Sequence, residues 1–378
     1  MSAPHDLFAA CAPGLEPLLE AELSSLGTLS PKAVPGGVVF GGHRRVLYRV
    51  NLESGLASHV RVRVGRFLAR SFEELEREAA QIPWERYLSP GVPRRFRVTA
   101  RKSRLHHTDA LAERLSKIIA IRLGDHLAVP DPGGVRVHLR IERDRAGCSI
   151  DSSGEPLHRR GWRTHVGPAP LREDLARALI VASGWEPGQA LWDPLCGSGT
   201  IAIEAATMAR GMAPGRMRGF DFERTPLLHA PTWDAVKAEA RDRVGESASS
   251  FGASDRDEAV LQAARANAER AGVEIAFERS SVTQAVRPEG PRGALVTNPP
   301  YGHRLGEGED LRPLYDALGR RAEELPPGWS AALYATDRKL GHRVGPGLTT
   351  AFVADAGGLK VRALVRSPAE SRPADAPS

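Results

Sequence analysis

The stretch ALWDPLCGSGTIAIEAA, residues 190–206, decides the fold of the second half of this chain. It begins as a short apolar strand, bends through a segment that contains Gly197 and Gly199, and continues as an apolar-periodic helix. The two glycines let backbone N–H groups approach a ligand closely, and the helix N-terminus that follows favours a carboxylate. A strand, a glycine-rich bend and a helix in this order predict the first unit of a doubly wound α/β sheet.

The next segment of sequence supports this prediction. Residues 250–255, SFGASD, read as a second strand that ends in Asp255, and a helix is expected from Asp257 to Ala271. An acid at the end of the second strand is the group that binds ribose hydroxyls in doubly wound nucleotide folds. Asp255 could instead cap the following helix, a role that Asp257 can also fill.

A third apolar stretch, GALVT at residues 293–297, reads as a buried strand and is followed by Asn298-Pro299-Pro300-Tyr301. The prolines stop the strand, because each lacks an N–H donor and has a fixed φ. An amide, a rigid turn and an aromatic ring are therefore left at the strand's carboxyl end, where ligands bind in open α/β sheets. An ordinary Asn-Pro turn with a surface tyrosine is the alternative interpretation of these four residues.

The chemistry of this turn suits a flat molecule that carries an exocyclic amine. The lone pair of such an amine is delocalised, so the nitrogen is a poor nucleophile. The Asn298 side-chain oxygen and the Pro299 carbonyl can accept both amine hydrogens and direct the lone pair toward an electrophile. Tyr301 can stack on the flat face and fix its orientation. No strong general base is required.

The glycine loop, the ribose acid and the amine-holding turn together resemble the class I S-adenosylmethionine methyltransferases that modify amino groups. The resemblance implies S-adenosylmethionine as cofactor, with its methionine carboxylate near Gly197 to Thr200 and its ribose near Asp255. Its methyl group would then point toward Asn298.

Composition narrows the class of protein. The chain has 378 residues, enough for two or three domains, and no apolar run long enough for a membrane-spanning helix. The N-terminus shows no signal-peptide pattern, and Cys11, Cys148 and Cys196 are far apart, without zinc or disulfide spacing. A cytoplasmic location without a metal site is expected. Cys196 is expected to be a small packed residue, not a methyl-transfer nucleophile.

Charge is unevenly distributed between the two halves of the chain. Residues 1–170 hold 26 Lys and Arg against 18 Asp and Glu, a balance of +8, and the other 208 residues hold 26 against 28, a balance of −2. A basic module in front of a nearly neutral catalytic half is typical of a protein that binds a polyanion.

The front half alternates strand and helix patterns in an α+β arrangement. A strand at 7–11, a helix at 14–26 and a hairpin at 34–40 come first. Helices at 43–52, 71–82 and 109–124 and strands at 59–64, 95–100 and 135–141 follow. Residues 94–104, RRFRVTARKSR, contain six basic residues and no acid. A solvated strand edge would explain them, but phosphate contact is the preferred interpretation.

Three other segments differ from these patterns. Residues 155–163, EPLHRRGWR, lead through Pro168-Ala-Pro170 into a helix expected at 171–183, and read as an interdomain linker. Residues 208–244 have no counterpart in a minimal methyltransferase sheet, and we interpret them as an insert beside the active site. Residues 367–378 lack apolar periodicity and are expected to be disordered.

The whole chain to about residue 366 resembles the THUMP-domain RNA guanine-N2 methyltransferases, in particular the bacterial enzymes that act on 23S ribosomal RNA. The segment LHRRGWR at 157–163 is similar to the family's Leu-His-x-Arg-Gly-Tyr-Arg junction, and the motifs DPLCGSGT and NPPYG are similar to its cofactor and catalytic motifs. The resemblance implies an N-terminal ferredoxin-like segment (1–44), a THUMP RNA-binding domain (45–158), a linker (159–170), a class I methyltransferase domain (171–366) and a tail (367–378).

The site residues expected from the motifs and the resemblance fall into three groups. Expected catalytic residues are Asn298, Pro299 and Tyr301. Expected cofactor-binding residues are Asp193, Pro194, Cys196, Gly197, Ser198, Gly199, Thr200, Asp255 and Ser281. Expected RNA-binding residues are Arg94, Arg95, Arg97, Arg101, Lys102, Arg104, Arg159 and Arg163.

The chain departs from the family pattern at two points. Ser281 stands where many relatives carry an aspartate that contacts the adenine amine, so a hydroxyl that can still hydrogen-bond replaces a carboxylate at this position. The chain also ends where some relatives continue into a second methyltransferase domain, so one methylation activity is expected.

Four alternatives to methylation of ribosomal RNA stay open. They are guanine-N2 methylation of tRNA, adenine-N6 methylation of DNA, glutamine-N5 methylation of protein, and an RNA-binding assembly factor without catalysis. The basic front half argues against the DNA and protein substrates. The intact glycine loop and Asn298 argue against loss of catalysis.

Overall fold

The computed structural model describes residues 4–125, 133–164, 171–300, 310–356 and 358–368. Contacts divide the chain into two compact units. The first comprises Met1–Cys11, Leu19–Leu157 and Arg218–Ala238, and the second comprises Ala12–Leu18, His158–Met217 and Glu239–Ser378. The tail predicted to be disordered lies outside the described residues from position 369 onward.

One seven-stranded sheet forms the first unit, in the order β2-β3-β1-β4-β7-β6-β5. Neighbouring strands are antiparallel except β5 and β6, which are parallel. The strands are β1 (His5–Ala10), β2 (Leu29–Val34), β3 (Gly37–Gly42), β4 (His59–Leu68), β5 (Arg94–Arg101), β6 (Val135–Glu142) and β7 (Arg145–Asp151). The helices are α1 (Glu16–Ser25), α2 (Arg44–Glu53), α3 (Phe72–Ala80) and α4 (Thr108–Leu123), with a 3-10 turn η1 (Trp84–Arg86).

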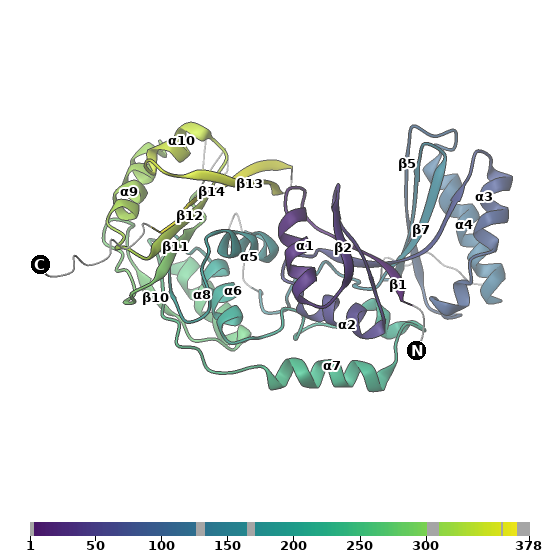
Figure 1. Ribbon diagram of the computed structural model, residues 1–378, viewed down its shortest axis with the longest axis horizontal. Coiled ribbons are helices and arrows are strands. Elements are labelled where there is room, and N and C mark those ends of the chain that lie inside the picture. The colour runs from purple at the N-terminus through teal and green to yellow at the C-terminus, as the bar shows by residue number, and fades with distance from the viewer. Residues whose placement is uncertain (1–3, 126–132, 165–170, 301–309, 357, 369–378) are drawn as a thin grey trace, which may run out of the picture. The chain divides into compact units, whose positions relative to one another are not determined.

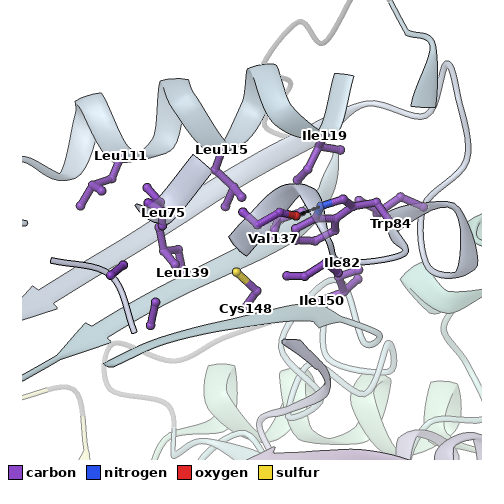
Figure 2. Close-up of a cluster of buried hydrophobic side chains, with 14 of the residues drawn as sticks. Leu75, Ile82, Trp84, Leu111, Leu115, Ile119, Val137, Leu139, Cys148 and Ile150 are labelled. Atoms are coloured by element: carbon purple, nitrogen blue, oxygen red, sulfur yellow. Dashed lines mark hydrogen bonds between the residues drawn. The ribbon is translucent and has the colours of Figure 1, made fainter. Parts of the chain in front are cut away.

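The core of this unit lies on one face of the sheet. Helices α3 and α4 lie along the side of β5 and β7 in Figure 1. Leu111, Leu115 and Ile119, spaced four residues apart on α4, point toward the strands in Figure 2. Val137 of β6 and Ile150 of β7 meet them from the sheet and are fully buried. Because side chains alternate along a strand, the neighbours of these residues point to the opposite face.

Most of the expected elements of the front half are confirmed, and one strand was missed. Helices α2, α3 and α4 and strands β4, β5 and β6 lie where periodicity predicted them. The predicted strand at 7–11, helix at 14–26 and hairpin at 34–40 correspond to β1, α1 and the β2–β3 pair. Strand β7 was not predicted, and it lies in the sheet between β4 and β6.

Part of the 208–244 segment, residues 218–238, groups by its contacts with the first unit, and its expected place beside the active site stays a prediction. A 3-10 turn, η2 (Asp221–Arg224), and the start of α7 (Ala230–Asp242) form this part. The Phe222 ring stacks on Tyr48 with centroids 4.7 Å apart. The Tyr48 hydroxyl donates to the Leu227 carbonyl (2.6 Å) and accepts from the His229 N–H (2.7 Å). Tyr48 of α2 thus anchors the segment.

The second unit is built on a seven-stranded sheet in the order β10-β9-β8-β11-β12-β14-β13. The first five strands are parallel, and β14 is antiparallel to β12 and β13. The strands are β8 (Ala190–Asp193), β9 (Phe251–Asp255), β10 (Ala276–Arg279), β11 (Gly293–Thr297), β12 (Trp329–Ala335), β13 (Thr349–Ala356) and β14 (Leu359–Arg366). The helices are α5 (Glu173–Ala182), α6 (Thr200–Ala209), α8 (Glu258–Ala271), α9 (Arg312–Glu323) and α10 (Arg338–Arg343).

The strand order places a topological switch point between β8 and β11. From β8 the chain adds β9 and β10 on one side, then crosses to add β11 and β12 on the other. The carboxyl ends of parallel strands flank such a point and form the binding crevice of open α/β folds. The doubly wound α/β sheet expected from the sequence is confirmed, with an antiparallel strand pair added at one edge.

Candidate functional site

The carboxyl ends of β8 and β11 are joined by a buried hydrogen bond. The Thr297 hydroxyl donates to Asp193 Oδ1 at 2.7 Å, and both residues are at most 1% exposed. The Leu195 N–H donates to the same oxygen at 3.2 Å. Burial raises the pKa of Asp193 to about 7, against the opposing effect of the Thr297 hydrogen bond. Asp193 is therefore an internal acceptor that holds the two strand ends together.

The glycine loop after β8 is shaped by two left-handed residues. Gly197 has φ +53° and Gly199 has φ +83°. A Cβ on Gly199 would come within 3.2 Å of Ala264 and Phe277 side-chain atoms, so only glycine fits there without movement. A Cβ on Gly197 would meet nothing within 4 Å, so the space beside this backbone is open to a ligand. The loop leads directly into Thr200, the first residue of α6.

Asp255, the residue expected to bind the cofactor ribose, lies against this loop. Its Oδ2 accepts from the Gly197 N–H at 3.0 Å, and its Oδ1 accepts from the Asp257 N–H at 3.1 Å. Asp257, not Asp255, caps α8, through a 2.9 Å bond from the Ala259 N–H. Ser281 follows the neighbouring strand β10, is exposed, and pairs with the Thr283 hydroxyl at 3.0 Å.

The Asn298 side-chain oxygen is buried and has no hydrogen-bond partner among the described residues. Asn298 directly follows β11, one residue beyond the Thr297–Asp193 bond. The turn is held from α9, because the Tyr315 hydroxyl donates to the Pro300 carbonyl at 3.3 Å. A buried acceptor without a donor costs free energy unless a bound molecule supplies one. Tyr301, the predicted stacking residue, lies outside the described residues.

Cys196 is a buried free cysteine of the glycine loop. Burial and the nearby carboxylates of Asp193 and Asp255 raise the pKa of the Cys196 thiol well above its usual value. The side chain therefore stays a protonated thiol and a poor nucleophile. Within the described ranges, no three His, Cys, Asp or Glu side chains gather into a possible metal site, and no helix there is long and apolar enough to cross a membrane.

The basic residues expected to contact RNA divide by exposure. Arg97, Arg101, Lys102, Arg104 and Arg159 are exposed, and Arg95 is half-buried. Arg94 is 1% exposed and pairs with Asp125 at 2.8 Å, and Arg163 pairs with Glu173 at 3.2 Å with 11% of its side chain exposed. Folding pairs each of these two arginines with an acid inside its own unit, which argues against a phosphate contact, and the RNA-binding role expected for them stays a prediction.

Strand register gathers further arginines on the face of the first unit's sheet opposite the core that α3 and α4 cover. Arg63, Ser149, His138 and Arg97 are successive partners across β4, β7, β6 and β5. The same face carries one further row of partners on each side of this row, again taken across β4, β7, β6 and β5. One row is Arg61, Asp151, Arg136 and Arg95. The other row is Arg66, Gly147, Arg140 and Thr99. We call the set Arg61, Arg63, Arg66, Arg95, Arg97, Arg101, Arg136, Arg140 and Arg145 the arginine face.

The arginine face carries excess positive charge. Asp6, Glu142 and Asp151 are the carboxylates on the same face of these strands, three against nine arginines. Burial lowers the pKa of Arg61. The carboxylate of Asp151 opposes this shift, and nearby arginines including Arg97 lower the pKa of Arg61 further. Mutual repulsion of this kind is relieved when an anion binds. Sequence alternation alone missed this set, because it depends on which strands are neighbours.

Comparisons with known proteins agree with this geometry. Residues 160–351 match the family model of the RMKL-like methyltransferase domain, and residues 6–61 match that of the RlmL ferredoxin-like domain. The ribosomal RNA large subunit methyltransferase K/L of Syntrophotalea carbinolica is 37% identical over 400 residues, which cover 100% of this chain and 56% of that protein. This chain spans about half the length of the curated relatives it matches.

Solved structures extend the likeness over both units. A possible methylase from Clostridium difficile 630 superposes with a TM-score of 0.89 at 31% identity, covering 98% of this chain and 99% of that one. A putative methyltransferase crystallised with SAH superposes with a TM-score of 0.87 at 29% identity, covering 98% of this chain and 100% of that one. With a methyltransferase-type glycine loop, a buried amide acceptor and these matches, the chain belongs to the RMKL-like methyltransferase family.

Proposed function

We propose that the protein transfers a methyl group from S-adenosylmethionine to the exocyclic N2 amine of a guanine in 23S ribosomal RNA. The observation that carries the proposal is the buried Asn298 oxygen, which finds no donor in the described part of the chain and lies at the switch point beside the glycine loop. The name of the relative from Syntrophotalea carbinolica supports ribosomal RNA of the large subunit as substrate. The resemblance of the sequence to guanine-N2 enzymes supports the choice of base and of atom.

The residues at the switch point fit the cofactor. Open space beside Gly197 lets an extended ligand lie against the loop, and the start of α6 favours a carboxylate. Asp255 lies at the loop and carries the carboxylate that a ribose requires. When bound there, S-adenosylmethionine would supply an electrophilic methyl group. The amine nitrogen would take the methyl and give up one proton to water, with S-adenosylhomocysteine as the second product.

Asn298 orients the amine in this proposal. Its Oδ1 accepts one N–H of the guanine amine, which satisfies the buried oxygen and fixes the direction of the nitrogen lone pair. The Thr297–Asp193 bond and the Tyr315–Pro300 bond hold the two ends of the short segment that carries Asn298. The acceptor is therefore preorganised, which is the condition under which positioning accelerates a reaction.

The arginine face is the surface that we propose for the RNA backbone. Arg66 and Arg140 are 60% and 66% exposed, and Gly147 lies between them on β7, so no large side chain separates these two guanidinium groups. Phosphates are the natural counter-charge for a surface with this excess of arginine. The exposed Lys102 and Arg104 lie just beyond the end of β5 and extend the same basic region.

A paired set of variants tests this surface. Replacing Arg97 and Arg140 with glutamine is expected to weaken RNA binding and to reduce the slope of log affinity against log salt by about one per residue. Arg122 of α4 is the matched control, since it is exposed on the helical side and pairs with Glu85 at 3.0 Å. Equal losses for Arg122→Gln in a filter-binding titration would remove the arginine face from the proposal.

The catalytic proposal is tested with labelled S-adenosylmethionine and four separate substrates: ribosomal RNA, tRNA, DNA and protein. Label is expected in ribosomal RNA, and Asn298→Ala is expected to lower kcat about 10²- to 10³-fold. Naked or partly assembled RNA is expected to react better than mature subunits, because the target base must leave its stack. Near wild-type activity of Asn298→Ala would remove that side chain from the mechanism.

A further inference from the structure

The junction at residues 160–164, Arg160-Gly-Trp-Arg-Thr164, is built into the second unit instead of bridging freely to it. Trp162 is 1% exposed and packs in a hydrophobic cluster with Ile203 of α6 and Ala268 of α8. Arg160 is 1% exposed, and its Nε lies 3.2 Å from Glu204 Oε1. The linker expected from the sequence is thus fixed, over these residues, to the two helices behind the glycine loop.

Arg163 reaches from this junction to the start of α6. Its Nη2 donates to the Thr200 hydroxyl at 2.8 Å and to the Leu171 carbonyl at 2.7 Å. Its Nε lies 3.2 Å from Glu173 Oε1. One planar guanidinium therefore ties the first residue of α6 to the beginning of α5, and a lysine ammonium cannot reproduce these diverging contacts at once.

Thr164 makes a second connection to the same loop through Asn267. The Thr164 N–H donates to Asn267 Oδ1 at 3.3 Å, and Asn267 Nδ2 donates to the Ser198 carbonyl at 3.3 Å. Asn267 is fully buried on the face of α8 that is otherwise apolar. Adjacent junction residues thus hold Ser198 and Thr200, the two residues on either side of Gly199.

We propose that Arg163 is a positioning residue for the cofactor, which sets the Ser198–Thr200 loop in its binding conformation, and that it makes no contact with RNA. This inference rests on the proposed function for the identity of the cofactor. Gly199 already forces a left-handed turn at the centre of the loop, so the hydrogen bonds on both sides decide how the loop backbone faces a ligand.

Cofactor affinity of the full chain tests the proposal without any RNA. Arg163→Met is expected to raise the Kd for S-adenosylhomocysteine, measured by titration calorimetry, by about ten- to a hundredfold. Arg163→Lys is expected to recover only part of this loss. The matched control is Arg270→Met, an exposed arginine of α8, which is expected to stay within about twofold of wild type.

Two further readouts separate positioning from general destabilisation. In the methylation assay, Arg163→Met is expected to raise KM for S-adenosylmethionine while kcat at saturation stays within about threefold. Thr200→Val removes the acceptor hydroxyl and Thr200→Ser keeps it. Only the valine variant is expected to weaken cofactor binding, and adding it to Arg163→Met is expected to cost little more. The threonine pair carries the test if Arg163→Met does not fold.

The result that overturns the inference is wild-type affinity of Arg163→Met for S-adenosylhomocysteine, or a selective loss of RNA affinity in that variant. If wild-type protein fails to bind S-adenosylhomocysteine, the cofactor assignment falls and this inference with it. If wild-type protein binds S-adenosylhomocysteine but methylates a different substrate, the proposed function fails while the role of Arg163 stands.

Discussion

Replacing Thr297 with valine removes the hydroxyl that joins β11 to Asp193 and leaves the shape of the residue nearly unchanged. The hydrogen bond is 2.7 Å long, and both partners are at most 1% exposed, so water cannot replace the lost donor. A buried bond to an ionisable group is worth about 1.5–3 kcal/mol, and we expect the free energy of unfolding to fall by this amount.

The same change is expected to lower kcat more than it affects cofactor affinity. Asn298 is the next residue, so freeing the end of β11 displaces the amine acceptor, and a displacement of about 1 Å costs on the order of a hundredfold in rate. Thr297→Ser keeps the donor and is the control. Urea denaturation and steady-state methylation measure the two effects. Wild-type kcat in Thr297→Val would refute the role of this bond in positioning Asn298.

The pH dependence of stability provides an independent check on Asp193. Its pKa is raised to about 7 by burial, so the folded state binds this proton more tightly than the unfolded chain, where the pKa is about 3.9. Protonated Asp193 therefore contributes to the free energy of unfolding fully below about pH 4, and this contribution is lost as pH rises through about 7. The total change is on the order of 4 kcal/mol. Asp193→Asn is expected to flatten this slope in unfolding curves. Burial also raises the pKa of Glu173 to about 7, so the pH dependence of stability that Glu173 contributes is expected to remain in this variant.

Three further predictions concern the glycine loop and the junction. Gly199→Ala is expected to lower the free energy of unfolding by about 1–3 kcal/mol, because residue 199 has a φ of +83° and its Cβ would be crowded. Gly197→Ala has open space around its Cβ and is expected mainly to weaken S-adenosylhomocysteine binding. Thermal melts and calorimetry measure the two effects, and equal melting temperatures for the two variants would contradict this difference. Cys196→Ala is expected to keep methylation activity, since the thiol is buried and protonated; loss of activity in a folded variant would contradict this. Arg160→Met is expected to cost about 3–5 kcal/mol in urea unfolding, because it leaves the buried Glu204 with less compensation; a change below about 1 kcal/mol would show that the pair is not stabilising.

The fold of the second unit could be predicted because local signals and global topology agree there. The glycine bend after β8, the acid that ends β9 and the prolines after β11 each mark a strand end in the sequence itself. Strand β7 was missed because Gly147 and Ser149 interrupt its pattern of large apolar residues. Its place in the sheet is set by pairing with β4 and β6, which no local window contains.

The roles of individual side chains were less predictable. Arg94 and Arg163 read as surface arginines, and only the folded chain brings Asp125 and Glu173 beside them. Residues 218–238 read as an insert in the catalytic half, but the partner that fixes them is Tyr48, far away in sequence. The sequence contains one signal of such a contact. Asn267 is a polar residue on the apolar face of α8, and its side chain donates a hydrogen bond to the Ser198 carbonyl.

The central claim is that Asn298 presents a guanine amine to a bound methyl donor, and identification of the methylated nucleoside tests it most directly. Wild-type protein and Asn298→Ala are incubated with labelled S-adenosylmethionine and 23S ribosomal RNA that lacks modifications, and the RNA is digested to nucleosides. The account predicts label in N2-methylguanosine with wild type and its near absence with the variant. Label in N6-methyladenosine, or equal label from both proteins, would contradict it.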